Sequence, residues 1–432
     1  MSAVGQSQPM TLADWLAWQE GLHDRPIDLG LERIRAVAER LAPLPPAPRV
    51  ITVGGTNGKG SAVALLEAIL RAAGYRVGCY TSPYLQRFTE QIRVDGAEVG
   101  EAVLCEAFQR VEATRGEVAL TAFEFTTLAV LDLFHRSALD VAILEVGLGG
   151  RLDAVNVVDG DAALITTVDL DHHDWLGPDR ESIGWHKAGI LRRDRPAVCA
   201  DPDPPRRLLE YAAASGARLW LRERDFTFSA LDGQRWIWHC AGIRRTLPCP
   251  ALSGEHQLAN AAGVLALLHA MRARLPVGEE AIAEGLRTAC TVGRQQVLQG
   301  PVQWWLDVAH NRQAIAALAS TLAATPCAGR TRAVVAMRAD KDATALQALA
   351  ALVDVWYPAG FPGPRGREAG ELAGLISAWS GAARPVTYPD VATACEAAAG
   401  DAGKGDRIVV FGSFVTVAAV LAANPMRHWN HG

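Results

Sequence analysis

Short apolar runs alternate with longer amphipathic stretches through the first half of the chain. Val50–Val53 is rich in β-branched residues, which is typical of a buried strand, and Ser61–Ala73 carries its apolar residues on one helical face. Further strand-like runs are Arg76–Tyr80, Val141–Val146 and Ala163–Val168. Strands that alternate with helices predict an α/β fold with a mostly parallel, doubly wound sheet.

The pattern changes in the second half of the chain. Asp225–His239 predicts an antiparallel hairpin around Asp232-Gly233, and a long helix is expected over His256–Leu275. A second α/β rhythm follows a break at Val292-Gly293. Its strands are expected at Trp304–Val308, Arg332–Met337, Val353–Tyr357 and Arg407–Phe411, and its helices at Gln313–Leu322, Ala343–Leu352 and Val391–Ala399. We therefore predict two domains, residues 1–290 and a smaller Rossmann-like α/β domain of residues 291–432.

Composition narrows the functional classes. Half of the 432 residues are apolar, and the net charge of −5 gives no electrostatic reason to expect nucleic acid or an anionic membrane as partner. No apolar run approaches the roughly 18 residues that a membrane span needs, and the polar N-terminus carries no signal-peptide pattern. The eight cysteines lack a C-x-x-C pair and are expected to be reduced core thiols. A cytoplasmic enzyme is the expectation.

A glycine-rich loop, Gly54–Ser61, lies between the first predicted strand and helix. Such a loop holds nucleotide phosphates with its backbone N–H groups and its lysine. We therefore expect a P-loop ATP site made by Thr56, Asn57, Gly58, Lys59, Gly60 and Ser61. The alternative is a glycine-rich turn with a surface lysine. Gly60 stands where the common P-loop pattern has the Ser or Thr that holds magnesium, so a metal would need oxygens from elsewhere.

Four further residues lie near the ends of predicted strands or in the helix beyond them, where open α/β sheets bind ligands. Ser82 belongs to a Thr-Ser-Pro turn, and Glu145 ends an apolar strand, where a carboxylate is costly unless it is paired or metal-bound. His172 lies among three aspartates and a second histidine. The alternatives are an ST-turn for Ser82 and a structural histidine for His172. Lys187 alone would be read as a surface lysine of a helix.

Together these segments resemble the folylpolyglutamate synthase/dihydrofolate synthase family of Mur-ligase-like amide ligases. The resemblance covers most of the chain, and its most specific segments are Gly55–Ser61, Glu145–Asp153 and Asp171–Gly177. The chain departs from the family pattern at a few positions, among them Tyr84, Gln91, His173, Trp185-His186, Val292 and Arg312.

The resemblance implies a set of cofactor and catalytic residues. Ser82, Glu145 and His172 would hold magnesium, with two ions expected and potassium possible, and Lys187 would be a carbamylated ligand. Asn260, Arg294 and Asp307 match ATP-contacting positions, and His310 and Ser413 lie where the family meets glutamate. Lys59, Lys187 and His310 are the catalytic residues that it implies. Asp340-Lys341-Asp342 either completes a second-domain motif or is a solvated charge cluster.

The resemblance also implies a pocket for dihydropteroate. Its residues would be Asp28, Leu29, Thr121, Phe123, Leu152, Asp153 and Ala154, with the ring of Phe123 facing the pterin. A flat pterin needs an apolar or aromatic wall with a few fixed polar partners, which these residues offer. The alternative for Phe123 is a core phenylalanine at the start of a helix.

The function so implied is ATP-dependent addition of L-glutamate to dihydropteroate and to tetrahydrofolates through an acyl phosphate, by a monomer. A folylpolyglutamate synthase without the first activity is one alternative. A muramyl or cyanophycin-type ligase is a second, and Gly60 disfavours it. A non-catalytic nucleotide switch is the third, and it would need no second domain with ATP contacts of its own.

Overall fold

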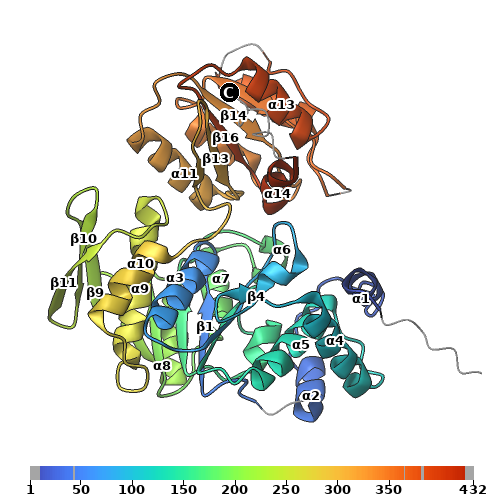
Figure 1. Cartoon of the computed structure of the whole chain (residues 1–432), viewed down its shortest axis with the longest axis vertical. Coiled ribbons are helices and arrows are strands. Elements are labelled where there is room, and N and C mark those ends of the chain that lie inside the picture. Colours follow the sequence, from blue (N-terminus) through green and yellow to red (C-terminus); the bar gives the residue numbers. More distant parts are fainter. Residues whose placement is uncertain (1–9, 42–43, 364, 381–383, 424–432) are drawn as a thin grey trace, which may run out of the picture.

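The structure is a computed structural model that describes residues 10–41, 44–363, 365–380 and 384–423. Residues 1–9, which bear on the absence of a signal peptide, lie outside the described part of the chain. Two α/β bodies follow one another along the sequence, and Figure 1 shows the C-terminal one stacked on one end of the other.

The first sheet has eight strands in the order β4-β3-β2-β5-β1-β6-β7-β8. The six strands from β2 to β8 in this order run parallel, whereas β3 and β4 form an antiparallel edge. The prediction of a mostly parallel, doubly wound α/β sheet is confirmed. The strands are β1 (Arg49–Gly54), β2 (Val77–Tyr80), β3 (Ile92–Val94), β4 (Ala97–Glu98), β5 (Val141–Glu145), β6 (Ala162–Ile165), β7 (Pro196–Cys199) and β8 (Arg218–Leu221).

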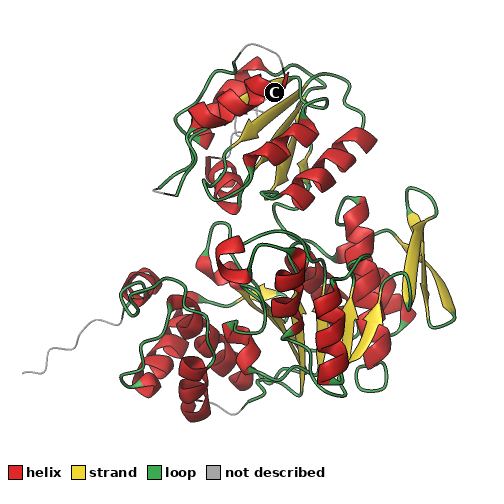
Figure 2. Cartoon of the chain, turned by 180° about the vertical axis from the view of Figure 1, so that it is seen from behind, coloured by secondary structure: helices red, strands yellow, loops and turns green. Residues whose placement is uncertain are grey.

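Helices cover both faces of this sheet (Figure 2). In β1, Val50 packs into one core cluster, whereas Ile51 and Val53 pack into another on the opposite face, because successive side chains of a strand point to opposite sides. The helices on the Val50 face of the sheet are α1 (Leu12–Gln19), α2 (Glu32–Leu41), α4 (Glu101–Arg115), α5 (Ala122–Arg136), α7 (Arg180–Ala188) and α8 (Arg206–Ser215). The helices on the Ile51 face are α3 (Lys59–Ala72), α9 (Glu255–Met271) and α10 (Glu279–Thr288). Short helical turns are η1 (Phe88–Gln91), η2 (Ala154–Val157) and α6 (His173–Leu176). An apolar run without alternation is therefore explained by burial on both faces.

The predicted hairpin is present and belongs to a three-stranded antiparallel sheet, β11-β10-β9. Its strands are β9 (Phe226–Ala230), β10 (Arg235–Cys240) and β11 (Ile243–Pro248), the last of which the sequence did not reveal. Trp238 of β10 is 1% exposed and donates its indole N–H to the carbonyl of Ala262 in α9 at 3.2 Å. The sheet thus packs against α9, away from the ends of the parallel strands.

The C-terminal sheet has the order β12-β13-β16-β14-β15, with β12 antiparallel to an otherwise parallel set. Trp304 and Trp305 of β13 enter different core clusters, so helices cover this sheet on both faces as well. A second, smaller α/β sheet is thus confirmed. Its elements are β12 (Gln296–Leu298), β13 (Gln303–Asp307), β14 (Thr331–Val335), β15 (Val355–Pro358), β16 (Arg407–Phe411), α11 (Arg312–Ala324), α12 (Ala369–Ser380), α13 (Val391–Asp401) and α14 (Phe414–Ala423).

The helix expected over residues 343–352 is present in a shorter form, and it is not an α-helix. The segment forms a 3₁₀ helix, η3 (Ala343–Leu349). Its buried residues include Ala343, Leu346 and Leu349, which recur every third residue and so match the three-residue turn of a 3₁₀ helix.

Two composition-based expectations can be compared with the structure. All eight cysteines are free, as expected, but not all are core residues: Cys290 is exposed, and Cys105, Cys249 and Cys327 are half-buried. Within the described residues, no helix is long and apolar enough to cross a membrane.

Candidate active site

The glycine-rich loop runs from the carboxyl end of β1 into the first turn of α3. Gly55 has a φ of 146°, and a Cβ there would lie 1.9 Å from Thr166 Oγ1. Gly58 has a φ of 87°, and its Cβ would lie 2.5 Å from Asn260 Oδ1. Glycine is required at both positions because L-residues avoid this backbone and neighbouring atoms fill the space. Asn260 of α9 therefore lies against the loop, and its contact with ATP stays a prediction.

The first turn of α3 presents backbone N–H groups to an anion. The first hydrogen bond within the helix is donated by Ala62 N to Gly58 O at 2.9 Å, so the N–H groups of residues 59–61 have no carbonyl partner within it. The positive end of the helix dipole lies at the same point. Residues 58–61 are therefore the part of the loop that fits phosphate.

Lys59 lies over this loop. Its Nζ donates to Gly55 O at 3.2 Å and to Thr56 O at 3.4 Å. Burial lowers the pKa of Lys59, and the carboxylate of Glu145 opposes that change. A half-buried cation beside a helix N-terminus is the arrangement that neutralises phosphate charge.

Glu145 and Ser82 lie together at the ends of β5 and β2. Glu145 is 3% exposed, and the nearby backbone N–H of Ser82 favours its carboxylate form by lowering its pKa. Burial raises the pKa of Glu145, whereas Lys59 and Arg294 favour the carboxylate. A buried carboxylate between two cations is placed to meet a metal–phosphate pair.

His172 and Lys187 line a small cavity of about 20 Å³ together with Lys59 and Asp171. Lys187 is 4% exposed, so the reading of a surface lysine is wrong. Burial lowers the pKa of His172 to about 4, which leaves a neutral imidazole able to bind a metal. Burial, with Lys59 as a further cause, lowers the pKa of Lys187 to about 7.

The predicted metal ligands fit a divalent cation with one condition. Hydroxyl, carboxylate and imidazole groups are metal donors, but a lysine is suited to a hard cation only after carbamylation gives it carboxylate-like oxygens. In the described ranges, no group of three His, Cys, Asp or Glu side chains could hold a metal ion by itself. A cation here would complete its shell with phosphate oxygens and water, as Mg²⁺ ordinarily does.

The C-terminal sheet contributes charges to the same site. A Cβ on Gly60 would lie 3.7 Å from Arg294 Nη2 and 3.8 Å from Glu145 Oε2, so Arg294 reaches the P-loop. Asp307, at the end of β13, accepts two backbone hydrogen bonds at 2.7 and 3.0 Å. Burial raises the pKa of Asp307 to about 6, although Arg294 and these bonds favour the carboxylate.

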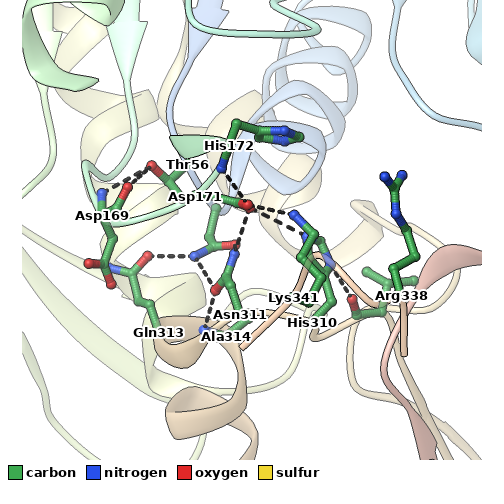
Figure 3. Close-up of polar contacts among 12 residues, drawn as sticks. Thr56, Asp169, Asp171, His172, His310, Asn311, Gln313, Ala314, Arg338 and Lys341 are labelled. Carbon is green, nitrogen blue, oxygen red and sulfur yellow. Dashed lines mark hydrogen bonds and ion pairs between the residues drawn. The ribbon is translucent and has the colours of Figure 1, made fainter. Parts of the chain in front are cut away.

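Asp171 joins the two bodies (Figure 3). Its Oδ1 lies 2.5 Å from Lys341 Nζ, and its Oδ2 lies 3.6 Å from His310 Nε2 and accepts a bond from Asn311 Nδ2 at 3.3 Å. Although burial opposes it, hydrogen bonding to His310 and the charge of Lys341 hold the pKa of Asp171 well below its usual range. Lys341 is therefore part of the site, and the reading of a solvated charge cluster does not fit it.

Ser413, the other residue expected to contact glutamate, lies at the start of a helix. It precedes α14, where its hydroxyl accepts the backbone N–H of Thr416 at 2.9 Å and lies 2.8 Å from the Thr416 hydroxyl. The hydroxyl thus caps a helix, and its contact with glutamate stays a prediction.

The segments predicted to bind dihydropteroate come together around the turn after β5. Phe123 stacks on Tyr80 with ring centroids 6.0 Å apart, and a Cβ on Gly147 would lie 2.7 Å from Phe123 Cζ. Asp153 accepts the backbone N–H of Leu148 at 2.7 Å. The structure therefore brings Phe123 and Asp153 to adjacent residues of one turn, with Leu152 and Ala154 on either side of Asp153.

Arg33 connects this group to the N-terminal segment that holds Asp28 and Leu29. Its Nη1 lies 2.6 Å from Asp28 Oδ2, and its Nη2 lies 3.2 Å from Glu124 Oε1. Glu124 in turn accepts the backbone N–H of Thr121 at 2.8 Å. Arg33 was not singled out from the sequence as a site residue, because nothing in its spacing connects it to Glu124.

Lysine usage is a signal that would have identified Lys341. The chain has four lysines among its 42 lysine and arginine residues. Lys59, Lys187 and Lys341 converge at this site, whereas Lys404 is exposed elsewhere. Where arginine supplies nearly all other positive charge, a lysine marks a position where a compact or reactive amine is needed.

Comparisons with known proteins place these features in a family. Residues 293–414 match the family model "Mur ligase, glutamate ligase domain". The chain is 46% identical over 411 residues to the dihydrofolate synthase/folylpolyglutamate synthase of Escherichia coli (strain K12), covering 95% of this chain and 94% of that protein.

Solved structures agree with this match. E. coli FolC in complex with DHPP and ADP superposes with a TM-score of 0.92 at 44% identity, covering 97% of this chain and 99% of that one. A bifunctional folylpolyglutamate synthase/dihydrofolate synthase with Mn, AMPPNP and L-glutamate bound gives 0.89 at 48% identity, covering 96% and 98%. The resemblance found in the motifs is confirmed. The chain belongs to the dihydrofolate synthase/folylpolyglutamate synthase family of Mur-ligase-like, ATP-dependent ligases.

Proposed function

We propose that this chain uses ATP to join the amine of L-glutamate to the carboxylate of dihydropteroate and then of tetrahydrofolates. The observation that carries the proposal is the convergence of three parts at the facing ends of the two sheets. These are the phosphate cradle of residues 58–61, the charged residues Arg294, His310 and Lys341 of the C-terminal body, and the Phe123–Asp153 group. The solved relatives carry ADP, DHPP and L-glutamate in their complexes, which supports these substrate classes.

The residues can perform the chemistry in two stages. An ionised carboxylate is a poor acyl donor, so it first takes the γ-phosphoryl group of ATP and becomes an acyl phosphate. Lys59 and Arg294 neutralise the charge of that group, because both lie against the first turn of α3. The amine of glutamate then attacks the acyl carbon, and phosphate leaves.

Asp171 and His310 are placed to serve the second stage. His310 Nδ1 lies 2.8 Å from the carbonyl oxygen of Val308, so that nitrogen carries the proton, and Nε2 faces Asp171. Lys341, with His310 beside Asp171, then forms an end of the site that fits the carboxylates of glutamate.

Magnesium is the expected divalent cation, and a relative binds manganese. Ser82, Glu145, His172 and a carbamylated Lys187 would hold it, with two ions and a potassium requirement retained as parts of the proposal. When bound, the cation would neutralise phosphate charge and orient the γ-phosphoryl group.

Residues 1–290 and 291–432 act as two domains of a monomer in this proposal. The first supplies the phosphate cradle and the pterin group, and the second supplies Arg294, Asp307 and His310. Closure of the second on the first is needed to complete the site.

The test measures phosphate release with dihydropteroate and with tetrahydrofolate, each with and without L-glutamate. We expect release that requires both acid and glutamate, with both acids accepted. Activity with tetrahydrofolate alone would identify a folylpolyglutamate synthase without the first activity. Turnover with a UDP-muramyl substrate in place of either acid would identify a muramyl-type ligase and overturn the proposal.

A further inference from the structure

The side chain of Asn57 is taken up by contacts within the protein. Its Nδ2 donates to Gln313 Oε1 at 2.6 Å and to Asn311 Oδ1 at 3.1 Å, and its Oδ1 accepts from Asn311 Nδ2 at 2.9 Å. Its backbone N–H donates to Thr167 Oγ1 at 3.1 Å. Asn57 was predicted to contact the nucleotide, yet its donors and its amide oxygen all have protein partners.

The partners of Asn57 lie on α11, in the other body (Figure 3). Asn311 is the N-cap of this helix, and its Oδ1 also accepts the backbone N–H of Ala314 at 3.0 Å. Gln313 lies in the first turn, where its Oε1 accepts a second bond from Thr167 Oγ1 at 3.0 Å. One amide oxygen of α11 therefore holds both the P-loop and the loop that follows β6.

This contact is adjacent to the phosphate cradle. Asn57 directly precedes Gly58, the N-cap of α3, whose left-handed backbone sets the direction of the first helical turn. Asn57 O also accepts the hydroxyl of Thr166 at 2.6 Å. A residue held on both its backbone and its side chain transmits the position of α11 to residues 58–61.

We propose that Asn57 is the point at which the P-loop senses domain closure, and that Gln313 is a positioning residue that locks it. With the contact formed, residues 58–61 are fixed and Arg294 lies over them. With it broken, the cradle still binds phosphates, but Arg294 is withdrawn from the reacting group. The inference rests on the proposed function in one respect, that residues 58–61 hold the phosphates of ATP.

The proposal predicts an effect on rate that exceeds the effect on nucleotide binding. Gln313→Met keeps the length of the side chain and removes the oxygen that accepts from Asn57 and Thr167. Because two half-buried donors then lose an acceptor, we expect kcat to fall about tenfold, with the dissociation constant of ATP changed less than about threefold.

Two further variants separate positioning from a general loss of structure. Gln347→Met makes the same chemical change at an exposed residue of the same body and should leave kcat unchanged. Gln313→Glu keeps an oxygen acceptor, and a carboxylate is favourable in the first turn of a helix, so this variant should recover most of the lost rate. Small-angle X-ray scattering with AMPPNP should show compaction for the wild type and for Gln313→Glu, and less for Gln313→Met.

Specific results would overturn the inference. A Gln313→Met variant with kcat within twofold of wild type and normal compaction would show that the contact does not position the loop. A tenfold loss of ATP affinity at unchanged kcat would make this a nucleotide-binding effect instead. Wild-type protein without acid-dependent turnover would refute the proposed function, whereas the scattering comparison would still decide whether Gln313 controls closure.

Discussion

Replacing Lys187 by alanine is expected to abolish ligation while the fold is retained. Lys187 lies in α7 and lines the small cavity with Lys59 and His172. We expect its neutral amine to attack CO₂, forming an N–C bond and releasing a proton, so that a carbamate oxygen faces the metal position. Alanine removes that oxygen, and short carboxylates such as acetate should restore part of the turnover.

Burial of Lys187 should make its amine much more reactive toward CO₂. Only the neutral amine is nucleophilic, and the lysine pKa falls from 10.5 to about 7. At pH 7.5 the neutral fraction therefore rises from about 0.1% to about three quarters, an increase of several hundredfold. The positive charge of Lys59, which contributes to this lower pKa, also favours the anionic carbamate once it forms.

The assay is carbon-13 NMR of the full-length protein equilibrated with labelled bicarbonate. The chain has only four lysines, so few amines compete. We expect one carbamate signal that grows as the pH rises through about 7, since deprotonation of Lys187 precedes reaction. The signal should vanish in Lys187→Ala and persist in Lys404→Ala, which changes an exposed lysine.

Absence of a carbamate signal from the labelled wild type between pH 7 and 8 would refute carbamylation of Lys187. Turnover of Lys187→Ala within threefold of wild type, without added carboxylate, would refute its role in ligation. A signal that survives in Lys187→Ala and disappears in Lys404→Ala would assign the carbamate to the surface.

Three other changes test separate parts of the site. Lys59→Ala should lower kcat by at least about 100-fold, because the cation that neutralises phosphate charge is lost. The thermal midpoint should not fall, because partial desolvation of this ammonium, which also lowers its pKa, is unfavourable in the free protein. Turnover within a few-fold of wild type would contradict the P-loop assignment. Burial raises the pKa of Asp153 from 3.8 to about 6, so the folded state holds this proton more tightly than the unfolded state. The free energy of unfolding should therefore fall by about 3 kcal/mol as the pH rises from about 4 to about 6. The free energy of urea unfolding of Asp153→Asn should lack this pH dependence. A variant with the same pH dependence as the wild type would contradict the prediction. Arg33→Met removes the guanidinium that pairs with Glu124 Oε1, which should lower the free energy of unfolding by about 1–3 kcal/mol. It should also raise KM for dihydropteroate more than KM for tetrahydrofolate. Arg35→Met, at an exposed position of the same helix, is the control.

Much of the first sheet and its ligand edge follows from local patterns. The P-loop lies between β1 and α3 because glycines, a lysine and a helix start occupy consecutive positions. Glu145 follows from an apolar strand that ends in a carboxylate. Since parallel strands end at one edge of a sheet, Ser82, Glu145 and His172 could be expected near one another before any distance was known.

Other features depend on contacts that no local pattern encodes. Lys341 and Asp171 are 170 residues apart, and each lies in a charge-rich segment that would be solvated if it had no partner. Arg33 and Glu124 are likewise joined only by the fold. The 3₁₀ helix η3 has a composition that suits an α-helix, and only the packing of every third residue distinguishes the two. Most residues of antiparallel β11 are polar or exposed, so its apolar signal is weak.

The contacts between the two bodies explain why closure can be reversible. The polar contacts are side-chain hydrogen bonds and ion pairs centred on Asn57 and Asp171, and Leu85 packs against the C-terminal core. Neutral bonds of this kind contribute about 0.5–1.5 kcal/mol each and those to charged groups about 1.5–3 kcal/mol. Water can replace these polar partners when the protein opens. A ligase must open to release its products, and a closed form held by many weak polar bonds meets that need. Lys341 and His310 would then exchange Asp171 for the carboxylates of glutamate, so that arrival of the last substrate and rearrangement of this contact become a single event.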